Sequence, residues 1–385
     1  MLFGWCRAPS GHSGSLFPAW SCTDVQQQEI EEAAPDTNEE VQAPKQPCLD
    51  EPLNIAGHWQ LFEPLKLGSV TDVQLVVNTQ TEEEAVLRTE DKDSEIGGLE
   101  REAYLLRKAS KCGGKTGLAT FFHFGVEADR HVLVTQLLGP SLEQKFEECG
   151  RGFSHKTVAN IAVQLLYRLE CVHDLGVLHR ALQPGCVRLG LGADSETLFL
   201  TDFTQAKVYK NGNQHIPYKE HGCRRSGSPG FSSVAEHLGA ERSRRDDLES
   251  LAFMLVYFLR GSLPWETHQD APSTEEVHAD LGEAKRSMDV QQVAAGLRPL
   301  EELFLYCRSL WFEASPNYHT LRRKFRKSIA IMESSEGKGM FDWSSVQRDD
   351  RFESEATAAD DVSTVMTGIS SMVPSTWTGW VSAGD

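Results

Sequence analysis

The chain has 385 residues, 40% of them apolar, which is enough to bury one large core or two smaller ones. Its formal net charge of −18 argues against nucleic acid as the main partner, because binding DNA or RNA requires a basic surface. No apolar run approaches the roughly 18–20 residues that a membrane span needs. Nine cysteines with no CxxC pair and no signal peptide favour reduced thiols inside the cell, in the cytoplasm, the nucleus or both.

Acidic residues gather at both ends of the chain. Residues 1–50 and 341–385 each hold eight acids and two bases. Polar, acidic segments of this kind cannot bury enough apolar surface to offset the entropy lost on ordering. The first 22 residues contain no acid and a single Arg, which favours a tail over an organellar presequence. We therefore predict a disordered acidic extension (1–53), a folded domain (54–343) and a disordered tail rich in Ser and Thr (344–385).

The first part of the predicted domain reads mainly as strands. Apolar and polar residues alternate over 73–77, and 85–87 and 132–134 are short apolar runs rich in β-branched residues. One helical pattern, over 99–108, falls among them.

The later part of the domain is helical. Ser154 is placed to cap a helix whose apolar residues recur every three or four positions up to Val172. Residues 246–260 predict a helix that is apolar on most sides, ended by Gly261 and Pro264, and such a helix belongs in the centre of a domain. Strands first and helices later predict an α+β fold with a small sheet-rich lobe (about 54–138) and a larger helical lobe (about 139–343).

The stretch His179–Cys186 resembles the catalytic loop of protein kinases, H-R-D-L-x-x-x-N, in which the Asp accepts the substrate proton and the Asn holds Mg²⁺. Ala181 stands at the position of the Asp, Gln183 at that of the loop lysine and Cys186 at that of the Asn. A methyl group cannot accept a proton, and a thiol is a poor ligand for Mg²⁺.

Further segments resemble the casein kinase 1 family of Ser/Thr protein kinases, in that family's order along the chain. The strongest are SRRDDLESL at 243–251 and YFLRGSLPW at 257–265. The others are LLGPSL at 137–142, DFTQAK at 202–207, CRSL at 307–310 and FDW at 341–343. The resemblance implies the bilobal protein-kinase fold, with an antiparallel sheet in the smaller lobe.

The same resemblance assigns a nucleotide site. Gly68 belongs to the glycine-rich loop, but residues 70–73 follow where further glycines would let backbone N–H groups approach the phosphates. Arg88 takes the position of the strand lysine that grips the phosphates, and Glu102 that of its helix partner. An ion pair between them would hold the helix in place, although Arg and Lys are not interchangeable. Lys66, as a relocated lysine, is the alternative.

Thr135 and Leu138 correspond to the back wall and the hinge of the adenine pocket. Asp202 keeps the acid of the family's D-F-G motif, while Thr204 replaces its glycine. One carboxylate can still bring Mg²⁺ to a bound nucleotide, and the alternative is a structural acid at the end of a strand.

His179, Arg180 and Phe203 are retained. The resemblance implies that His179 and Phe203 belong to a buried spine that ties the two lobes together, so the fold is expected to survive without the chemistry. The basic run 322–327 reads as a helix face or, alternatively, as a nuclear signal.

The family's basic pocket for phosphorylated or acidic substrates is also altered. Gly230 stands at the position of its arginine and Gln269 at that of a later basic residue, while Gly261 remains. Without these cations the pocket loses most of its attraction for anions, although Arg224 and Arg225 could compensate in part.

Three functions follow from these residues. The first is a catalytically inactive, casein kinase 1-like protein that acts through binding, as a scaffold or regulator. The second is an active Ser/Thr protein kinase with unorthodox residues that transfers the γ-phosphate of ATP to proteins. The third is a nucleotide-binding switch without turnover. The sequence favours the first, with weak or absent binding of ATP and Mg²⁺, protein partners or a protein substrate, and a monomeric state.

Overall fold

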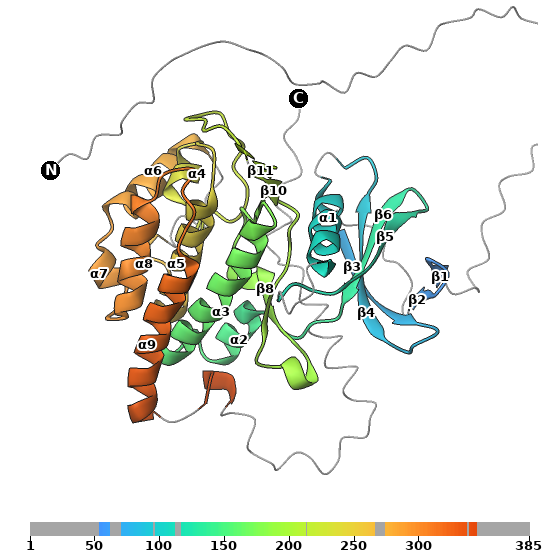
Figure 1. Ribbon diagram of the computed structural model, residues 1–385, viewed down its shortest axis with the longest axis horizontal. Helices are drawn as coiled ribbons and strands as arrows, with labels where there is room; N and C mark the ends of the chain where they lie inside the picture. Colours follow the sequence, from blue (N-terminus) through green and yellow to red (C-terminus); the bar gives the residue numbers. More distant parts are fainter. Residues whose placement is uncertain are drawn as a thin grey trace, which may run out of the picture. The chain divides into compact units, whose positions relative to one another are not determined.

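The computed structural model describes residues 54–61, 71–94, 97–111, 117–212, 214–265, 274–336 and 339–344. Its N-terminal part is a six-stranded antiparallel sheet in the order β1-β2-β3-β4-β6-β5 (Figure 1). The strands are β1 (Asn54–Ile55), β2 (Trp59–Leu61), β3 (Thr71–Asn78), β4 (Glu84–Asp91), β5 (Phe121–Glu127) and β6 (Arg130–Gln136). β3, β4 and β6 are the three predicted strands. β1 and β2 are too short to show a sequence period.

One helix, α1 (Gly98–Ser110), packs against β4, β5 and β6. It covers the predicted helix and extends it at both ends. The carboxylate of Glu90, in β4, accepts hydrogen bonds from the backbone N–H groups of Gly98 (3.2 Å) and Leu99 (3.0 Å). These are donors that a helix cannot satisfy within itself at its first turn. Strand β4 therefore fixes the N-terminus of α1.

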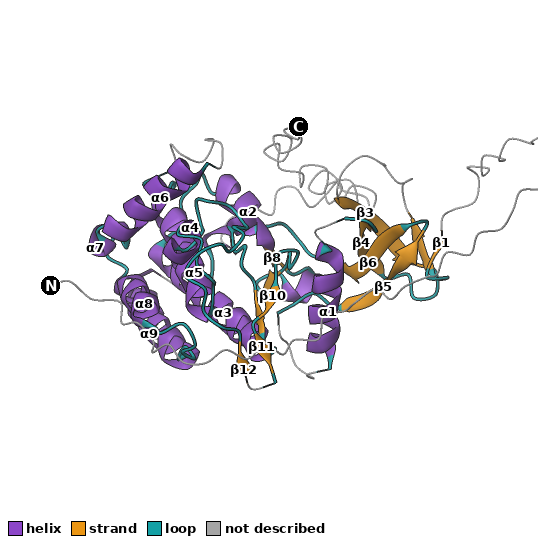
Figure 2. Ribbon diagram, turned by 90° about the horizontal axis from the view of Figure 1, so that it is seen from above, coloured by secondary structure: helices purple, strands orange, loops and turns teal. Residues whose placement is uncertain are grey.

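The C-terminal part is mostly helical (Figure 2). Its helices are α2 (Leu142–Glu148), α3 (His155–Asp174), α4 (Val234–His237), α5 (Arg244–Arg260), α6 (Glu275–Ser287), α7 (Val290–Val293), α8 (Arg298–Ser309) and α9 (Tyr318–Glu336). Short antiparallel strand pairs join β7 (Val177–Leu178) to β10 (Lys207–Val208), β8 (Val187–Leu189) to β9 (Leu198–Leu200) and β11 (Lys210–Asn211) to β12 (Gln214–His215). The 3₁₀ turns are Pro184–Cys186, Gly192–Asp194 and Asp342–Ser344. A small sheet lobe followed by a helical lobe confirms the predicted α+β class.

Helix α5 forms the centre of the helical lobe, as predicted. Every residue from 246 to 258 is buried, and α5 packs against α3 and α8. The helix begins two residues earlier than predicted, because Asp246 bends back and accepts the Ser243 N–H at 2.7 Å. Ser154 caps α3 as predicted, since its hydroxyl accepts the Thr157 N–H at 3.2 Å.

Gly261 ends α5 in the left-handed conformation, with φ of 83°. A Cβ atom at this position would lie 2.9 Å from the carbonyl oxygen of Arg151. We expect Gly261→Ala to lower the free energy of unfolding by about 1–2 kcal/mol, since a side chain is disfavoured at positive φ. Urea denaturation measures this. Gly152→Ala is the control, because its added Cβ would meet nothing within 4 Å; an equal loss in both variants would contradict the assignment.

The basic run 322–327 lies in α9, which packs on α3 and α8. Arg322 pairs with Glu170 and Lys324 with Glu302, so part of the run is engaged with neighbouring helices. The predicted extension 1–53 and the predicted tail 344–385, apart from Ser344 in the last 3₁₀ turn, lie outside the described residues.

Candidate functional site

The loop that carries His179 to Cys186 follows β7 and is held by one buried carboxylate. Asp247, on α5, accepts the backbone N–H groups of His179 (2.8 Å) and Arg180 (2.9 Å) and contacts His173 Nε2 at 2.9 Å. Burial by itself would raise the pKa of Asp247, but the hydrogen bond and the charge of His173, with the charge of His179, lower it. The loop is therefore fixed by a structural acid on the central helix.

Two of the residues at the catalytic positions of this loop are hydrogen-bonded to each other. The Cys186 thiol donates to the Gln183 carbonyl at 2.9 Å, and the Gln183 N–H donates to the Cys186 sulfur at 3.2 Å. Burial raises the pKa of the Cys186 thiol well above its usual range, so the sulfur stays neutral. Ala181 is nearly buried and presents only a methyl group. The Ala181 methyl group cannot take a proton from a hydroxyl, and the neutral Cys186 thiol cannot replace a carboxamide as a ligand of Mg²⁺.

The segment Asp202–Thr204 lies beside this loop. Asp202 adopts the left-handed conformation, with φ of 62°, and its Oδ1 accepts the Thr204 hydroxyl at 2.7 Å. Phe203 is fully buried, and its ring centre lies 4.9 Å from that of His179. The predicted spine pair is thus in contact. Thr204 fits because residue 98 is glycine: a Cβ there would lie 2.9 Å from the Cβ of Thr204.

The predicted ion pair between strand and helix is formed. Nη1 of Arg88 lies 2.8 Å from both carboxylate oxygens of Glu102, and Glu102 Oε2 also accepts the Phe203 N–H at 3.3 Å. Burial by itself would lower the pKa of Arg88, but the charges of Glu102 and Asp202 outweigh it and raise that pKa. Arg101 donates to the Thr204 carbonyl at 2.7 Å. Helix α1 is therefore bound to both β4 and the Asp202 segment.

The predicted adenine-pocket residues lie at the end of the sheet. Thr135, in β6, pairs with Val86 of β4, and both Thr135 and Leu138 are buried. Just beyond them, the Gly139 N–H donates to the Leu189 carbonyl at 2.8 Å, which joins this segment to β8. Gly68 lies outside the described residues, as does Lys66, the alternative to Arg88 as the phosphate-binding residue.

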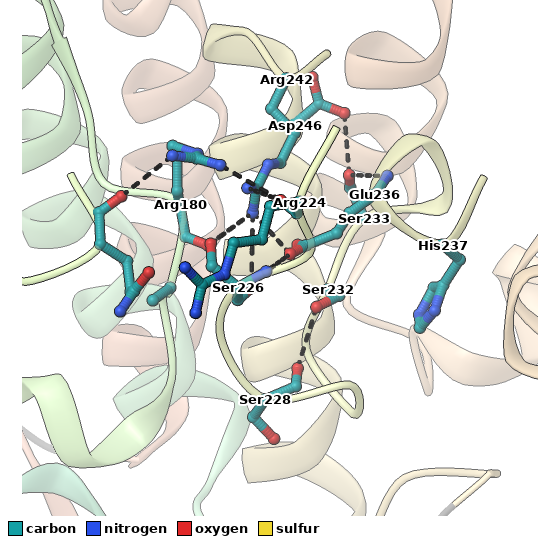
Figure 3. A network of polar contacts seen from close by, with 12 residues as sticks. Arg180, Arg224, Ser226, Ser228, Ser232, Ser233, Glu236, His237, Arg242 and Asp246 are labelled. Atoms are coloured by element: carbon teal, nitrogen blue, oxygen red, sulfur yellow. Dashed lines mark hydrogen bonds and ion pairs between the residues drawn. The ribbon is translucent and has the colours of Figure 1, made fainter. Parts of the chain in front are cut away.

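A buried arginine ties the catalytic-loop position to the segment before α4 (Figure 3). Arg242 donates to Glu236 Oε1 at 2.6 Å, to Ser226 Oγ at 2.9 Å and to the Arg180 carbonyl at 3.1 Å. Glu236 Oε1 also accepts the Ser226 N–H at 2.7 Å. The side chains of Arg242 and Glu236 are each only 3% exposed. This pair was not predicted from the sequence.

Arg180 completes the network. Its side chain donates to the carbonyl groups of Gln205 (3.5 Å) and Arg224 (3.4 Å), so it links two parts of the segment between β9 and α4. Burial and the nearby charge of Arg242 lower the pKa of Arg180 to about 10, which leaves it charged at neutral pH. Arg180 therefore serves as a structural bridge.

The segment around Gly230, predicted to form the substrate pocket, is held by Trp265 and Lys285. The sequence did not indicate the role of Lys285. The Trp265 indole N–H donates to the Gly230 carbonyl at 2.9 Å, and Gln269 lies outside the described residues. Lys285, fully buried on α6, donates to the carbonyl groups of Pro229 and Ser232, each at 2.7 Å. Burial lowers the pKa of Lys285 to about 7.

A sequence signal for this lysine exists. The buried residues of α6 are at positions 278, 281, 282 and 285, so Lys285 occupies the buried stripe of an amphipathic helix. Arg225, predicted to supply charge to the substrate pocket, instead forms an ion pair with Glu275. The charge of Lys285, which is buried next to Gly230, is thus used for internal carbonyl groups.

The structure therefore brings together five of the residues considered above: Arg88, Glu102, His179, Asp202 and Phe203. Cys186 lies close enough to Asp202 for the charge of that carboxylate to help raise the pKa of the thiol. Within the described residues, no group of three or more His, Cys, Asp or Glu side chains is arranged to hold a metal ion. A cluster of one acid and one ion pair can bind cationic or phosphate-bearing groups, but it offers no proton acceptor at position 181.

The described residues form a sheet lobe that packs on helix α1 and a separate helical lobe, and an ion pair joins β4 to α1 beside Asp202. This arrangement defines the class of protein kinases. The family model of the protein kinase domain matches residues 59–311, and the chain belongs to that family. None of the helices in the described part of the chain is long and apolar enough to cross a membrane.

Proposed function

We propose that this protein is a casein kinase 1-like pseudokinase that works by binding other proteins, as a scaffold or regulator. The proposal rests mainly on the catalytic loop, whose side chains at positions 181 and 186 lack the groups that phosphate transfer requires. A neutral, buried thiol stands where the Mg²⁺ ligand is needed, and the nearby methyl group of Ala181 cannot act as a general base.

The proposed subfamily rests on segments that build the central helix. SRRDDLESL supplies the first half of α5, including the Asp247 that holds the loop, and YFLRGSLPW supplies its end and Trp265. Asp246, in the first segment, accepts the Ser233 hydroxyl at 2.9 Å, and Trp265, in the second, donates to the Gly230 carbonyl at 2.9 Å. We expect the ligands of such a protein to be other proteins, because a kinase domain that has lost catalysis can still bind them through its surface.

Weak or absent nucleotide binding is part of the same proposal. The Thr204 hydroxyl occupies one oxygen of Asp202, so Mg²⁺ would have to compete with this contact. Arg88 keeps the charge of the phosphate-binding lysine, but its planar guanidinium does not replace a compact ammonium group. ATP and Mg²⁺ would be held, if at all, by Arg88, Asp202 and the backbone near Leu138.

Thermal denaturation of the full chain with millimolar ATP and Mg²⁺ tests this point. If ATP is present at about 100 times its Kd, binding would stabilise the native state by about 2.7 kcal/mol. For a domain of this size, that raises the midpoint of thermal denaturation by roughly 5–10 °C. We expect a shift below about 1 °C. A shift of several degrees would overturn the weak-binding part of the proposal and favour the nucleotide-binding switch.

A slowed but active Ser/Thr kinase is the second candidate. The Arg88–Glu102 pair and the contact between His179 and Phe203 favour it, since both belong to an assembled kinase lobe. Rates of phosphate transfer separate the two candidates.

A further inference from the structure

Helix α9 presents a basic stripe that takes no part in the proposed function. Arg323, Arg326 and Lys327 are all exposed, and the second and third of them follow the first by three and four positions. Side chains at this spacing share one face of a helix. Within the described residues, none of these three cations forms an ion pair. The stripe is therefore a patch of uncompensated positive charge.

The other members of this basic run are used inside the fold. Arg322 pairs with Glu170 of α3, and Lys324 pairs with Glu302 of α8 at 2.7 Å. Phe325 is fully buried. An extended nuclear signal would need the whole run unwound, which would remove Phe325 from the core at a cost in buried apolar surface. The folded protein therefore offers only the three cations of the stripe, held on a helix.

The stripe favours a ligand with several negative charges. Like charges three or four positions apart on a helix repel each other, and a bound anion removes that repulsion. The next acid along the helix, Glu333, follows Arg326 by roughly 10 Å of helix, so it does not neutralise the stripe. A single exposed ion pair is worth little. A peptide with several carboxylates therefore fits three cations better than one small anion does.

The chain itself contains a segment of matching charge. Residues 349–361 hold six acids and one base, Arg351, which gives the segment a net charge of −5. Four of the acids fall within its first seven residues: Asp349, Asp350, Glu353 and Glu355. No Lys or Arg follows Arg351 in the rest of the sequence. The segment therefore offers a dense set of carboxylates with little competing positive charge.

This acidic segment follows a part of the chain that lies against the same helix pair. Toward one end of α3, Glu170 pairs with Arg322, and toward the other end the Asn160 amide donates to the Met340 carbonyl at 3.0 Å. Helix α9 therefore runs antiparallel to α3, and residues 339–344 lie beside the first half of α3.

The chain that leads from this point to the acidic segment is long enough to reach the stripe. Lys327 lies nine residues before Glu336, where α9 ends, which is roughly 14 Å along the helix. From Ser344, five residues lead to Asp349 and seventeen to Asp361. Chains of these lengths span at most about 18 Å and 61 Å. A short tether keeps the segment at a high effective concentration, so a weak contact is sufficient.

We propose that the acidic segment 349–361 binds to the basic stripe of α9 in the same molecule. Carboxylates of the segment accept hydrogen bonds from the guanidinium groups of Arg323 and Arg326 and from the ammonium group of Lys327. Each exposed pair contributes little, so binding depends on several pairs together and weakens with salt. The contact does not involve the catalytic loop, so it stands or falls separately from the proposed pseudokinase function.

Carbodiimide cross-linking of the full chain tests this contact, because the reagent joins a lysine amine to a carboxylate in direct contact with it. Peptide mass spectrometry of the monomer fraction should find Lys327 linked to acids of the segment 349–361. The yield should fall about fivefold or more when NaCl is raised from roughly 0.05 M to about 1 M, since the screening length then drops to about 3 Å.

Two double variants make the test specific to the stripe. Arg323→Gln/Arg326→Gln keeps Lys327 as the reactive amine but removes two of the three charges, and it should lower the cross-link yield about fivefold. Lys219→Gln/Arg286→Gln removes two exposed cations elsewhere and should leave the yield unchanged. The assignment is overturned if no link joins Lys327 to the segment or if both double variants give equal yields. Links found only in cross-linked dimers would also overturn it, since the segment would then come from a second copy.

Discussion

Replacing Glu236 with Gln is expected to lower the free energy of unfolding by about 3–5 kcal/mol, because it leaves the Arg242 guanidinium charged and buried without its counter-charge. The two side chains are almost fully buried and 2.6 Å apart. Glu236 also holds the Ser226 N–H, so the variant weakens the contact between the loop at Arg180 and the segment before α4. Chemical denaturation of the full chain, with the slope checked for constancy, measures the change.

Glu275→Gln is the matched control for this prediction. Glu275 also pairs with an arginine, Arg225, at 2.6 Å, but its side chain is 81% exposed. An exposed ion pair is worth about 0–1 kcal/mol, so the control should lose little. The double variant Glu236→Leu/Arg242→Met should recover part of the loss, since it removes both buried charges together. Similar losses in Glu236→Gln and Glu275→Gln would show that the buried network does not hold this segment.

Replacing Ala181 with Asp is expected to raise phosphate transfer from ATP by less than about tenfold, although a general base alone is typically worth roughly 10²–10⁴ in rate. The variant still has Gln183, Cys186 and Arg88 at the positions whose usual residues place the phosphates and Mg²⁺. Residues that act as a unit do not contribute additively, so one of them restored alone gains little. Initial rates on casein with Mg²⁺ or Mn²⁺ measure the gain.

The triple variant Ala181→Asp/Gln183→Lys/Cys186→Asn serves as the comparison and should exceed the single variant. Space beside Ala181 is limited, since a Cβ atom built on the neighbouring Gly227 would lie only 3.3 Å from the Cβ of Ala181. Thermal denaturation of both variants therefore checks that the larger side chains leave the protein folded. A gain of 100-fold or more from Ala181→Asp alone would contradict the account, since it would leave the base as the single missing part.

Much of the fold could be predicted from the sequence because its signals are local. The alternation at 73–77, the Ser154 cap and the apolar helix before Gly261 each predict an element that the structure contains. The ion pair of Arg88 and Glu102 was also predictable, since a resemblance over many segments aligned both residues. The boundaries were less so: Asp246 reads as a helix start but serves as a cap inside the first turn.

The missed residues depend on contacts between distant segments. Glu236 and Arg242 lie in a polar stretch, and nothing local indicates that both are buried by the loop at Arg180. Thr204 reads only as the loss of a glycine, whereas the structure shows that Gly98 provides the room for its side chain. Lys285 shares the buried stripe of α6, but a lysine at such a position is ordinarily assigned to the surface.

Phosphate transfer by the unmodified full chain is the measurement that tests the central claim most directly. The protein is incubated with ATP and either Mg²⁺ or Mn²⁺, and the incorporation of γ-phosphate into casein and into the chain itself is followed. The account predicts a rate no higher than that of a Glu102→Gln variant of the same chain, because Ala181, at the position of the base, has no group that accepts a proton. Transfer at about 1–100 s⁻¹, the usual range of kinases, would contradict it.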